Sequence, residues 1–178
     1  MVRGKNIAIL LLLVAMAGAA HADFSADMVT KARGVTQTAK LFVKGDNRRI
    51  EMPGAALVII ARGDKKVTWL LSPKTKTYRE MAGAQTKHGS AYYDRVPGIQ
   101  RLGKEKANGY LCSKYAIRTQ GKVPATTTIW VSDELSMEVK AVTQTAGVAQ
   151  SLDLTNIRKR WLWNGSLFNL PKGYKKVG

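Results

Sequence analysis

The chain has 178 residues, one cysteine and a formal net charge of +17 at pH 7, from 29 basic and 12 acidic residues. A single cysteine excludes an intramolecular disulfide, and a chain of this length can fold as one domain without one. A charge this large favours anionic partners, although it could also serve solubility alone.

The first 22 residues have the pattern of a secretory leader. Arg3 and Lys5 supply a positive start, residues 7–14 form an unbroken apolar run, and Ala20-His21-Ala22 has alanines at both positions that a cleavage site requires. The apolar run is too short to span a bilayer, which needs about 20 apolar residues.

The residue after this site is Asp23 rather than the cysteine that lipid attachment would require. We therefore expect a cleaved signal peptide over 1–22 and a periplasmic, non-lipidated domain over 23–178. The expected mature chain keeps 27 basic and 12 acidic residues, a net charge of +15. Because nucleic acid is a poor partner after export, the expected anions are lipid head groups, lipopolysaccharide phosphates or an acidic protein.

Apolar and polar side chains alternate at period two through much of residues 23–178, and helical periodicity is almost absent. This pattern is typical of antiparallel sheets with one covered face. Turn signals such as Gly45-Asp46-Asn47, Asn108-Gly109 and Ala146-Gly147 separate the strands. Strands are predicted at 24–31, 35–44, 47–52, 56–62, 66–71, 76–81, 100–107, 110–119, 124–132, 137–145 and 148–157.

Residues 82–98 show no clear period and predict a long loop with room for one short helix. Loops of this length are often binding segments. His88, in this loop, is the one histidine of residues 23–178. Ser90 and Asp94 could complete a triad with it on paper, but the local sequence does not resemble a nucleophile elbow. We therefore predict no catalytic residues and no enzyme activity.

Metal and cofactor sites are also not expected, since no two ligand residues stand at metal-binding spacing. Cys112 is expected to pack in the interior, because free cysteine is among the most buried residue types. Arg62-Gly63-Asp64 lies between two predicted strands and is interpreted as a hairpin turn.

The C-terminal part interleaves positive charge with indole rings. Such a combination suits the interface of a membrane, where tryptophan rings lie at head-group level. Packing of the following residues, 167–174, against the sheet is the structural alternative. The candidates for contact with an anionic surface are Arg158, Lys159, Arg160, Trp161 and Trp163.

Three segments resemble exported bacterial proteins classed as a domain of unknown function. Residues 67–78 (VTWLLSPKTKTY) resemble their W-x-L-(D/S)-P-x-x-K-x-Y hairpin. Residues 108–115 (NGYLCSKY) and 166–174 (SLFNLPKGY) are similar to two further motifs of these proteins. The pattern is in turn similar to that of the LolA/LolB-like lipoprotein-localisation factors of the periplasm.

This resemblance implies an all-β fold with minor helix, a strongly curved antiparallel sheet that forms an open half-barrel of about 10–11 strands. In the localisation factors the concave face holds lipid acyl chains, so the expected function is non-catalytic binding of a lipid, a lipidated protein or another apolar ligand. The alternative is a basic envelope protein that docks on an anionic surface or an acidic partner. The candidate lining residues, which could instead fill a closed core, are Trp69, Leu71, Tyr78, Tyr115, Ile117, Trp130, Val139, Leu152 and Leu154.

Overall fold

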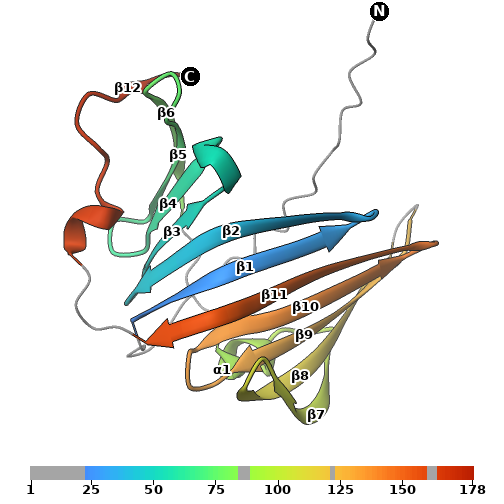
Figure 1. Ribbon diagram of the computed structural model, residues 1–178. Helices are drawn as coiled ribbons and strands as arrows, with labels where there is room; N and C mark the ends of the chain where they lie inside the picture. Colours follow the sequence, from blue (N-terminus) through green and yellow to red (C-terminus); the bar gives the residue numbers. More distant parts are fainter. Residues whose placement is uncertain (1–22, 84–88, 121–122, 160–163) are drawn as a thin grey trace, which may run out of the picture.

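The computed structural model describes residues 23–83, 89–120, 123–159 and 164–178. They form one open, curved 12-stranded sheet with little helix (Figure 1), in the order β12-β6-β5-β4-β3-β2-β1-β11-β10-β9-β8-β7. The predicted fold class is confirmed. The strands are β1 (Phe24–Ala32), β2 (Val35–Lys44), β3 (Asn47–Glu51), β4 (Val58–Arg62), β5 (Val67–Ser72), β6 (Thr77–Ala82), β7 (Ile99–Ala107), β8 (Tyr110–Thr119), β9 (Ala125–Ser132), β10 (Met137–Thr145), β11 (Val148–Lys159) and β12 (Lys175–Lys176).

Local sequence sets this meander. Asn108 and Gly109 adopt φ values of 50° and 86° between β7 and β8, as a two-residue hairpin turn requires. The short helix predicted within the long loop is α1 (Ser90–Tyr93), and two 3₁₀ helices, η1 (Pro53–Ala55) and η2 (Gly165–Phe168), complete the described elements. None of the described helices is long and apolar enough to cross a membrane.

β1 joins two meanders at the centre of the sheet. It pairs with β2 on one side and with β11 on the other, both antiparallel. The strands β2–β6 therefore continue from one side of β1, and β11 back to β7 continue from the other (Figure 1).

The strand register defines two faces of this sheet. The face that α1 contacts, here called the α1 face, carries a row of paired residues in each half of the sheet: Ala26, Leu41, Ile50, Ile59 and Leu70 in one, and Leu152, Ala141, Ile129 and Tyr115 in the other. The opposite face is here called the strap face. It carries the row Phe42, Arg49, Ile60 and Trp69, and the C-terminal residues 164–178, here called the strap, lie against it.

β-bulges interrupt three strands. In β11, Asn156 and Ile157 together stand opposite Ala26 of β1. In β7 and β10 the extra residues are Leu102 and Val139. A bulge bends its strand and increases the local twist. The three bulges therefore contribute to the curvature of the open sheet.

Two details differ from the sequence prediction. The expected sheet is antiparallel throughout, whereas β12 pairs in parallel with β6, because the strap returns along the edge of the first meander. Alternation in residues 138–143 places Glu138 with the polar side chains, whereas it is only 3% exposed. The bulge after Glu138 inserts one residue, so the alternation on either side of it is out of phase.

Candidate functional site

The nine predicted lining residues lie on both faces of the sheet. Four of them, Trp69, Leu71, Tyr78 and Trp130, belong to the strap face by strand register. Four others, Tyr115, Ile117, Leu152 and Leu154, belong to the α1 face. Val139 is the extra residue of the β10 bulge and is fully buried. They therefore do not form one continuous wall.

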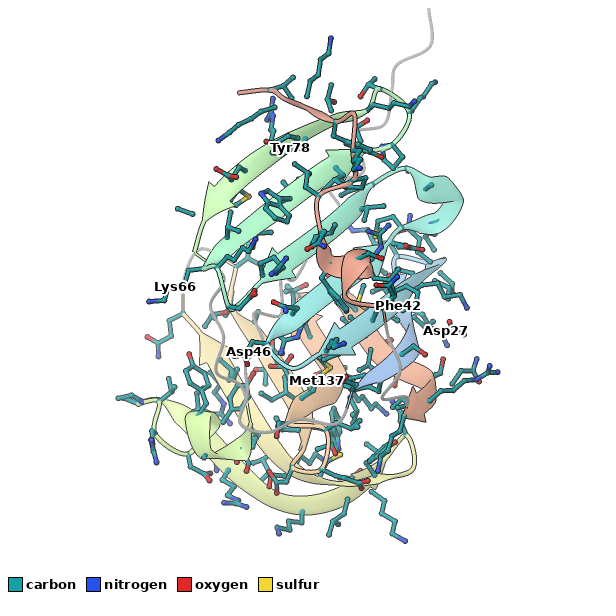
Figure 2. All side chains as sticks on the ribbon, turned by 90° about the vertical axis from the view of Figure 1, so that its left-hand side faces the viewer. Asp27, Phe42, Asp46, Lys66, Tyr78 and Met137 are labelled. Atoms are coloured by element: carbon teal, nitrogen blue, oxygen red, sulfur yellow. The ribbon has the colours of Figure 1, made fainter. Side chains whose placement is uncertain are left out.

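The strap covers part of the strap-face group. Phe168 of η2 is 1% exposed and packs in one cluster with Val58, Ile60, Trp69 and Leu71. Figure 2 looks onto this face, with η2 in front of the strands and Tyr78 near the top. Here the chain's own side chains fill the space that a ligand would need.

Two arginines hold this strap by its backbone. Arg49 Nη1 donates to the carbonyl of Leu167 at 3.1 Å. Arg62 Nη1 donates to the carbonyl of Phe168 at 3.2 Å and to Asn169 Oδ1 at 2.8 Å. The Arg62 guanidinium also forms a two-pronged contact with Asp64, at 2.8 and 2.6 Å. The Arg-Gly-Asp tripeptide thus has a structural use in a hairpin turn, as predicted.

Trp130 lies elsewhere on the strap face and is 8% exposed. The Nζ atoms of Lys114 and Lys140 lie 4.9 and 5.0 Å from its ring centroid, one from each neighbouring strand. Both distances are within the range of a cation–π contact. This tryptophan is therefore covered by two cationic side chains.

On the α1 face, the buried Tyr115 anchors the short helix. Its hydroxyl donates to Asp94 Oδ1 at 2.9 Å and lies 3.2 Å from the carbonyl of Ser90. Burial, together with the adjacent Asp94 carboxylate, raises the pKa of Tyr115 to about 12. Arg101 lies over the ring, 5.8 Å from its centroid, and also contacts Asp94. Tyr115 is thus a packed anchor for α1.

Beyond Tyr115, the α1 face continues as a band of half-buried residues. Thr30 pairs with Leu152, and Thr143, Thr127, Ile117 and Ile99 pair in turn along the next row. None of these side chains is fully buried. We call this band the open strip; it consists of Thr30, Leu152, Thr143, Thr127, Ile117 and Ile99.

Two charged side chains that the sequence analysis did not select lie in the interior. Arg48 is 8% exposed and Glu138 is 3% exposed. Burial lowers the pKa of Arg48 to about 10 and raises the pKa of Glu138 to about 8, and the opposite charge of the partner offsets each shift in part. Among the described residues, Glu138 Oε2 has no hydrogen-bond partner. Only recognition of the β10 bulge could have identified Glu138 from sequence.

The remaining predicted residues have varied positions. Cys112 is fully buried, which confirms its expected packing, and burial raises the pKa of its thiol to about 11. Arg158 and Lys159 are exposed at the end of β11, where Lys159 contacts Glu134. The other predicted surface residues, Arg160, Trp161 and Trp163, lie outside the described residues, as does His88. No group of three potential metal ligands occurs among the described residues.

Two of the hollows on the surface of the described residues contain groups of interest. One, of about 310 Å³, lies beside the β11 bulge and includes Asp27, Lys40, Phe42 and Arg158 in its lining. There Lys40 Nζ contacts Asp27 Oδ1 at 2.5 Å, and Asn156 donates to Asp27 Oδ2 at 2.8 Å, and both hydrogen bonds lower the pKa of Asp27.

The other hollow, of about 230 Å³, lies between η1 and the strap, where Val58, Leu71 and Tyr174 contribute to its lining. Neither hollow is lined by residues of the open strip.

The geometry defines a class of protein: an open β-sheet with one face partly covered by a short helix and the other by the chain's own C-terminus. A family model described as "Domain of unknown function (DUF4412)" matches residues 25–139. The chain therefore belongs to this family, which confirms the predicted domain of unknown function. Among curated proteins, no sequence matches this chain.

Solved structures share the fold at low sequence identity. An uncharacterized conserved protein from Thermus thermophilus is similar with a TM-score of 0.60 and 14% identity, over 89% of this chain and 91% of that one. PNGF-II is similar with a TM-score of 0.58 and 10% identity, over 88% of this chain and 31% of that one.

A chain of the Pseudomonas aeruginosa MucA/MucB complex is also similar, with a TM-score of 0.54 and 12% identity. The match covers 83% of this chain and 55% of that one. This chain thus spans about a third of PNGF-II and just over half of the chain from the MucA/MucB complex. At sequence identities this low, the structural similarity shows a shared fold: the curved open sheet that the sequence resemblance implied.

Proposed function

We propose that this protein binds a lipid, a lipidated protein or another apolar ligand along the α1 face of its sheet, without catalysis, in the bacterial periplasm. The observation that carries the proposal is the open strip. It extends the buried apolar rows of the α1 face as a band of partly exposed side chains.

The composition of the strip suits an acyl chain. Burial of each CH₂ group of an acyl chain gains about 0.8 kcal/mol. Even a short stretch of acyl chain in contact with Leu152, Ile117 and Ile99 would therefore bind with useful affinity. The threonines between them can contact polar atoms near a head group. Thr127 and Thr143 are hydrogen-bonded to each other at 2.9 Å, so their hydroxyl groups add little polar cost to such a wall.

A change within the strip tests this proposal. Ile117→Lys places a charge in the strip, and Thr128→Lys adds the same charge on the opposite face of the adjacent strand. We expect Ile117→Lys to weaken the binding of a fluorescent fatty acid at least about tenfold, because burying a charge beside an acyl chain is costly. Thr128→Lys should bind the probe like the wild type. Circular dichroism checks that both variants fold.

Native mass spectrometry of protein purified from a Gram-negative periplasm provides the complementary test. Phospholipid or acylated-protein adducts on the wild type, reduced by Ile117→Lys, support the proposal. A clean mass together with no binding of the fatty acid contradicts it.

A second candidate function is docking on an anionic surface of the envelope. The specific observation is the net charge of +17, with exposed basic side chains at the end of β11 and along the edge strand β7. A charge of this size favours association with anionic lipid. This function is separate from acyl-chain binding, since it depends on exposed cations and not on the open strip.

A further inference from the structure

Among the strands that the structure describes, β7 lies at one edge of the sheet and pairs with β8 (Figure 1). Seven of its nine residues are exposed. It lies at the end of the sheet opposite β12. The β7–β8 hairpin therefore presents a long accessible surface.

Two large apolar side chains are exposed on this hairpin. Leu102, the extra residue of the β7 bulge, is 46% exposed, and Leu111 at the start of β8 is 58% exposed. Leu111 pairs directly with Lys106, and Lys104 pairs with Ser113 two positions further along. Because side chains alternate along strands, Lys104, Lys106 and Leu111 lie on the same side of the hairpin.

The two lysines are available for an external anion. Among the residues that the structure describes, neither Lys104 nor Lys106 forms an ion pair, whereas Arg101 contacts Asp94 and Lys114 contacts Glu105. The carboxylates of Asp94 and Glu105 are thus already matched by other cations. Lys104 and Lys106 therefore carry unneutralised charge on the same side of the hairpin as the exposed Leu111.

Protection of the sheet edge against pairing explains the exposed lysines of this hairpin but not its exposed leucines. Lysines on an edge strand discourage pairing with other sheets. Exposed leucines have the opposite tendency, since they add apolar surface at the same edge. Apolar side chains flanked by lysines instead suit a membrane interface, where the apolar groups enter the head-group region and the ammonium groups meet lipid phosphates.

We propose that the β7–β8 hairpin docks this protein on an anionic phospholipid surface, with Leu102 and Leu111 entering the interface and Lys104 and Lys106 facing lipid phosphates. This inference rests on the second candidate function and names the surface that performs it. The surface is distinct from the residues predicted at the end of β11.

The test measures co-sedimentation with vesicles of phosphatidylglycerol and phosphatidylethanolamine, compared with phosphatidylcholine vesicles. The charge variant is Lys104→Glu with Lys106→Glu. Its matched control is Lys65→Glu with Lys74→Glu, which makes the same charge change at two exposed turns of the other meander. Each lysine near an anionic surface raises the affinity for that surface roughly fivefold. We therefore expect the affinity of the hairpin variant for the anionic vesicles to fall roughly twentyfold or more, and that of the control variant to fall much less.

A second pair separates apolar insertion from charge. Leu102→Ser with Leu111→Ser should weaken binding to the anionic vesicles, whereas Val35→Ser with Val177→Ser, at sites 47% and 41% exposed, should not. Thermal unfolding confirms that each variant is folded.

The outcomes separate the hairpin from the general function. In one outcome the wild type binds the anionic vesicles and the hairpin variants and the controls reduce that binding equally; in another, neither set of variants reduces it. Either result overturns the hairpin as the docking surface, and the second candidate function stands. No wild-type binding to anionic vesicles overturns both, including a result in which only lipopolysaccharide or an acidic protein is bound. Fatty-acid binding to the open strip is measured separately and does not depend on any of these results.

Discussion

Glu138 is a buried carboxyl group whose position depends on one inserted residue in β10. Its charged form is disfavoured because burial removes it from water, and the nearby Arg48 offsets this cost only in part. The folded protein therefore holds a proton on Glu138 under conditions in which the unfolded chain has released it. The stability that this group contributes is fully present below pH 4.5, its ordinary pKa, and is lost as pH rises towards its folded pKa of about 8.

Glu138→Gln should remove this dependence, because glutamine stays neutral. Relative to the wild type, the unfolding temperature of the variant should rise steadily between about pH 5 and about pH 8. Thermal unfolding at several pH values measures the difference, and Glu134→Gln, on the surface, is the matched control. Parallel curves for wild type and Glu138→Gln would mean that Glu138 does not titrate in this range.

The Cys112 thiol gives a second prediction at this scale. It is fully buried, and its raised pKa leaves little of the reactive thiolate at neutral pH. We expect a thiol reagent to modify the native protein at least about a hundredfold more slowly than the protein in denaturant. The absorbance of the released chromophore measures both rates. Equal rates would show that the packing around Cys112 opens readily.

At the scale of elements, the strap is held against the sheet by side-chain packing and by hydrogen bonds. Phe168 is the buried side chain of the strap over β4 and β5. Leu167, Leu170 and Tyr174 pack partly buried around the same cluster, and the arginine contacts fix the backbone beside it. The short β12 then pairs with Thr77 and Tyr78 of β6, and Lys176 contacts Glu80 at 2.8 Å. The strap is thus anchored mainly through η2.

Phe168→Ala should destabilise the protein by about 3–5 kcal/mol, the usual range for a buried phenylalanine. Val177→Ala, in the same strap but 41% exposed, should change stability by less than about 0.5 kcal/mol. Denaturant unfolding measures both values, and limited proteolysis reports whether the strap detaches first. A Phe168→Ala variant as stable as the wild type would show that η2 does not anchor the strap.

Most of the strands could be predicted from sequence, because alternation and turn residues are local signals. The Asn108-Gly109 turn, for example, fixes the β7–β8 hairpin within a few residues. The residues of the candidate site were harder to predict from the sequence. Alternation shows which side chains share a face within one strand, but the faces of distant strands are related only through register, so Trp69 and Tyr115 could not be assigned to opposite faces.

At the scale of the whole molecule, the excess of positive charge separates the two candidate functions. Binding to an anionic surface should fall steeply between low salt and about 0.15 M salt, since exposed charges are screened beyond a Debye length of roughly 8–10 Å. Fatty-acid binding should change little over the same range. Vesicle co-sedimentation and fatty-acid fluorescence, each measured across a salt series, test this prediction. Equal salt dependence in both assays would contradict it.

The β1–β11 pairing also has a consequence for the order of folding. Each meander is built from neighbouring hairpins and can form as soon as its own residues are available. The seam between them brings together residues such as Asp27 and Thr155, 128 positions apart. This joint can close only after nearly the whole chain is present, so its formation is expected to be the slow step in which two preformed halves become one sheet.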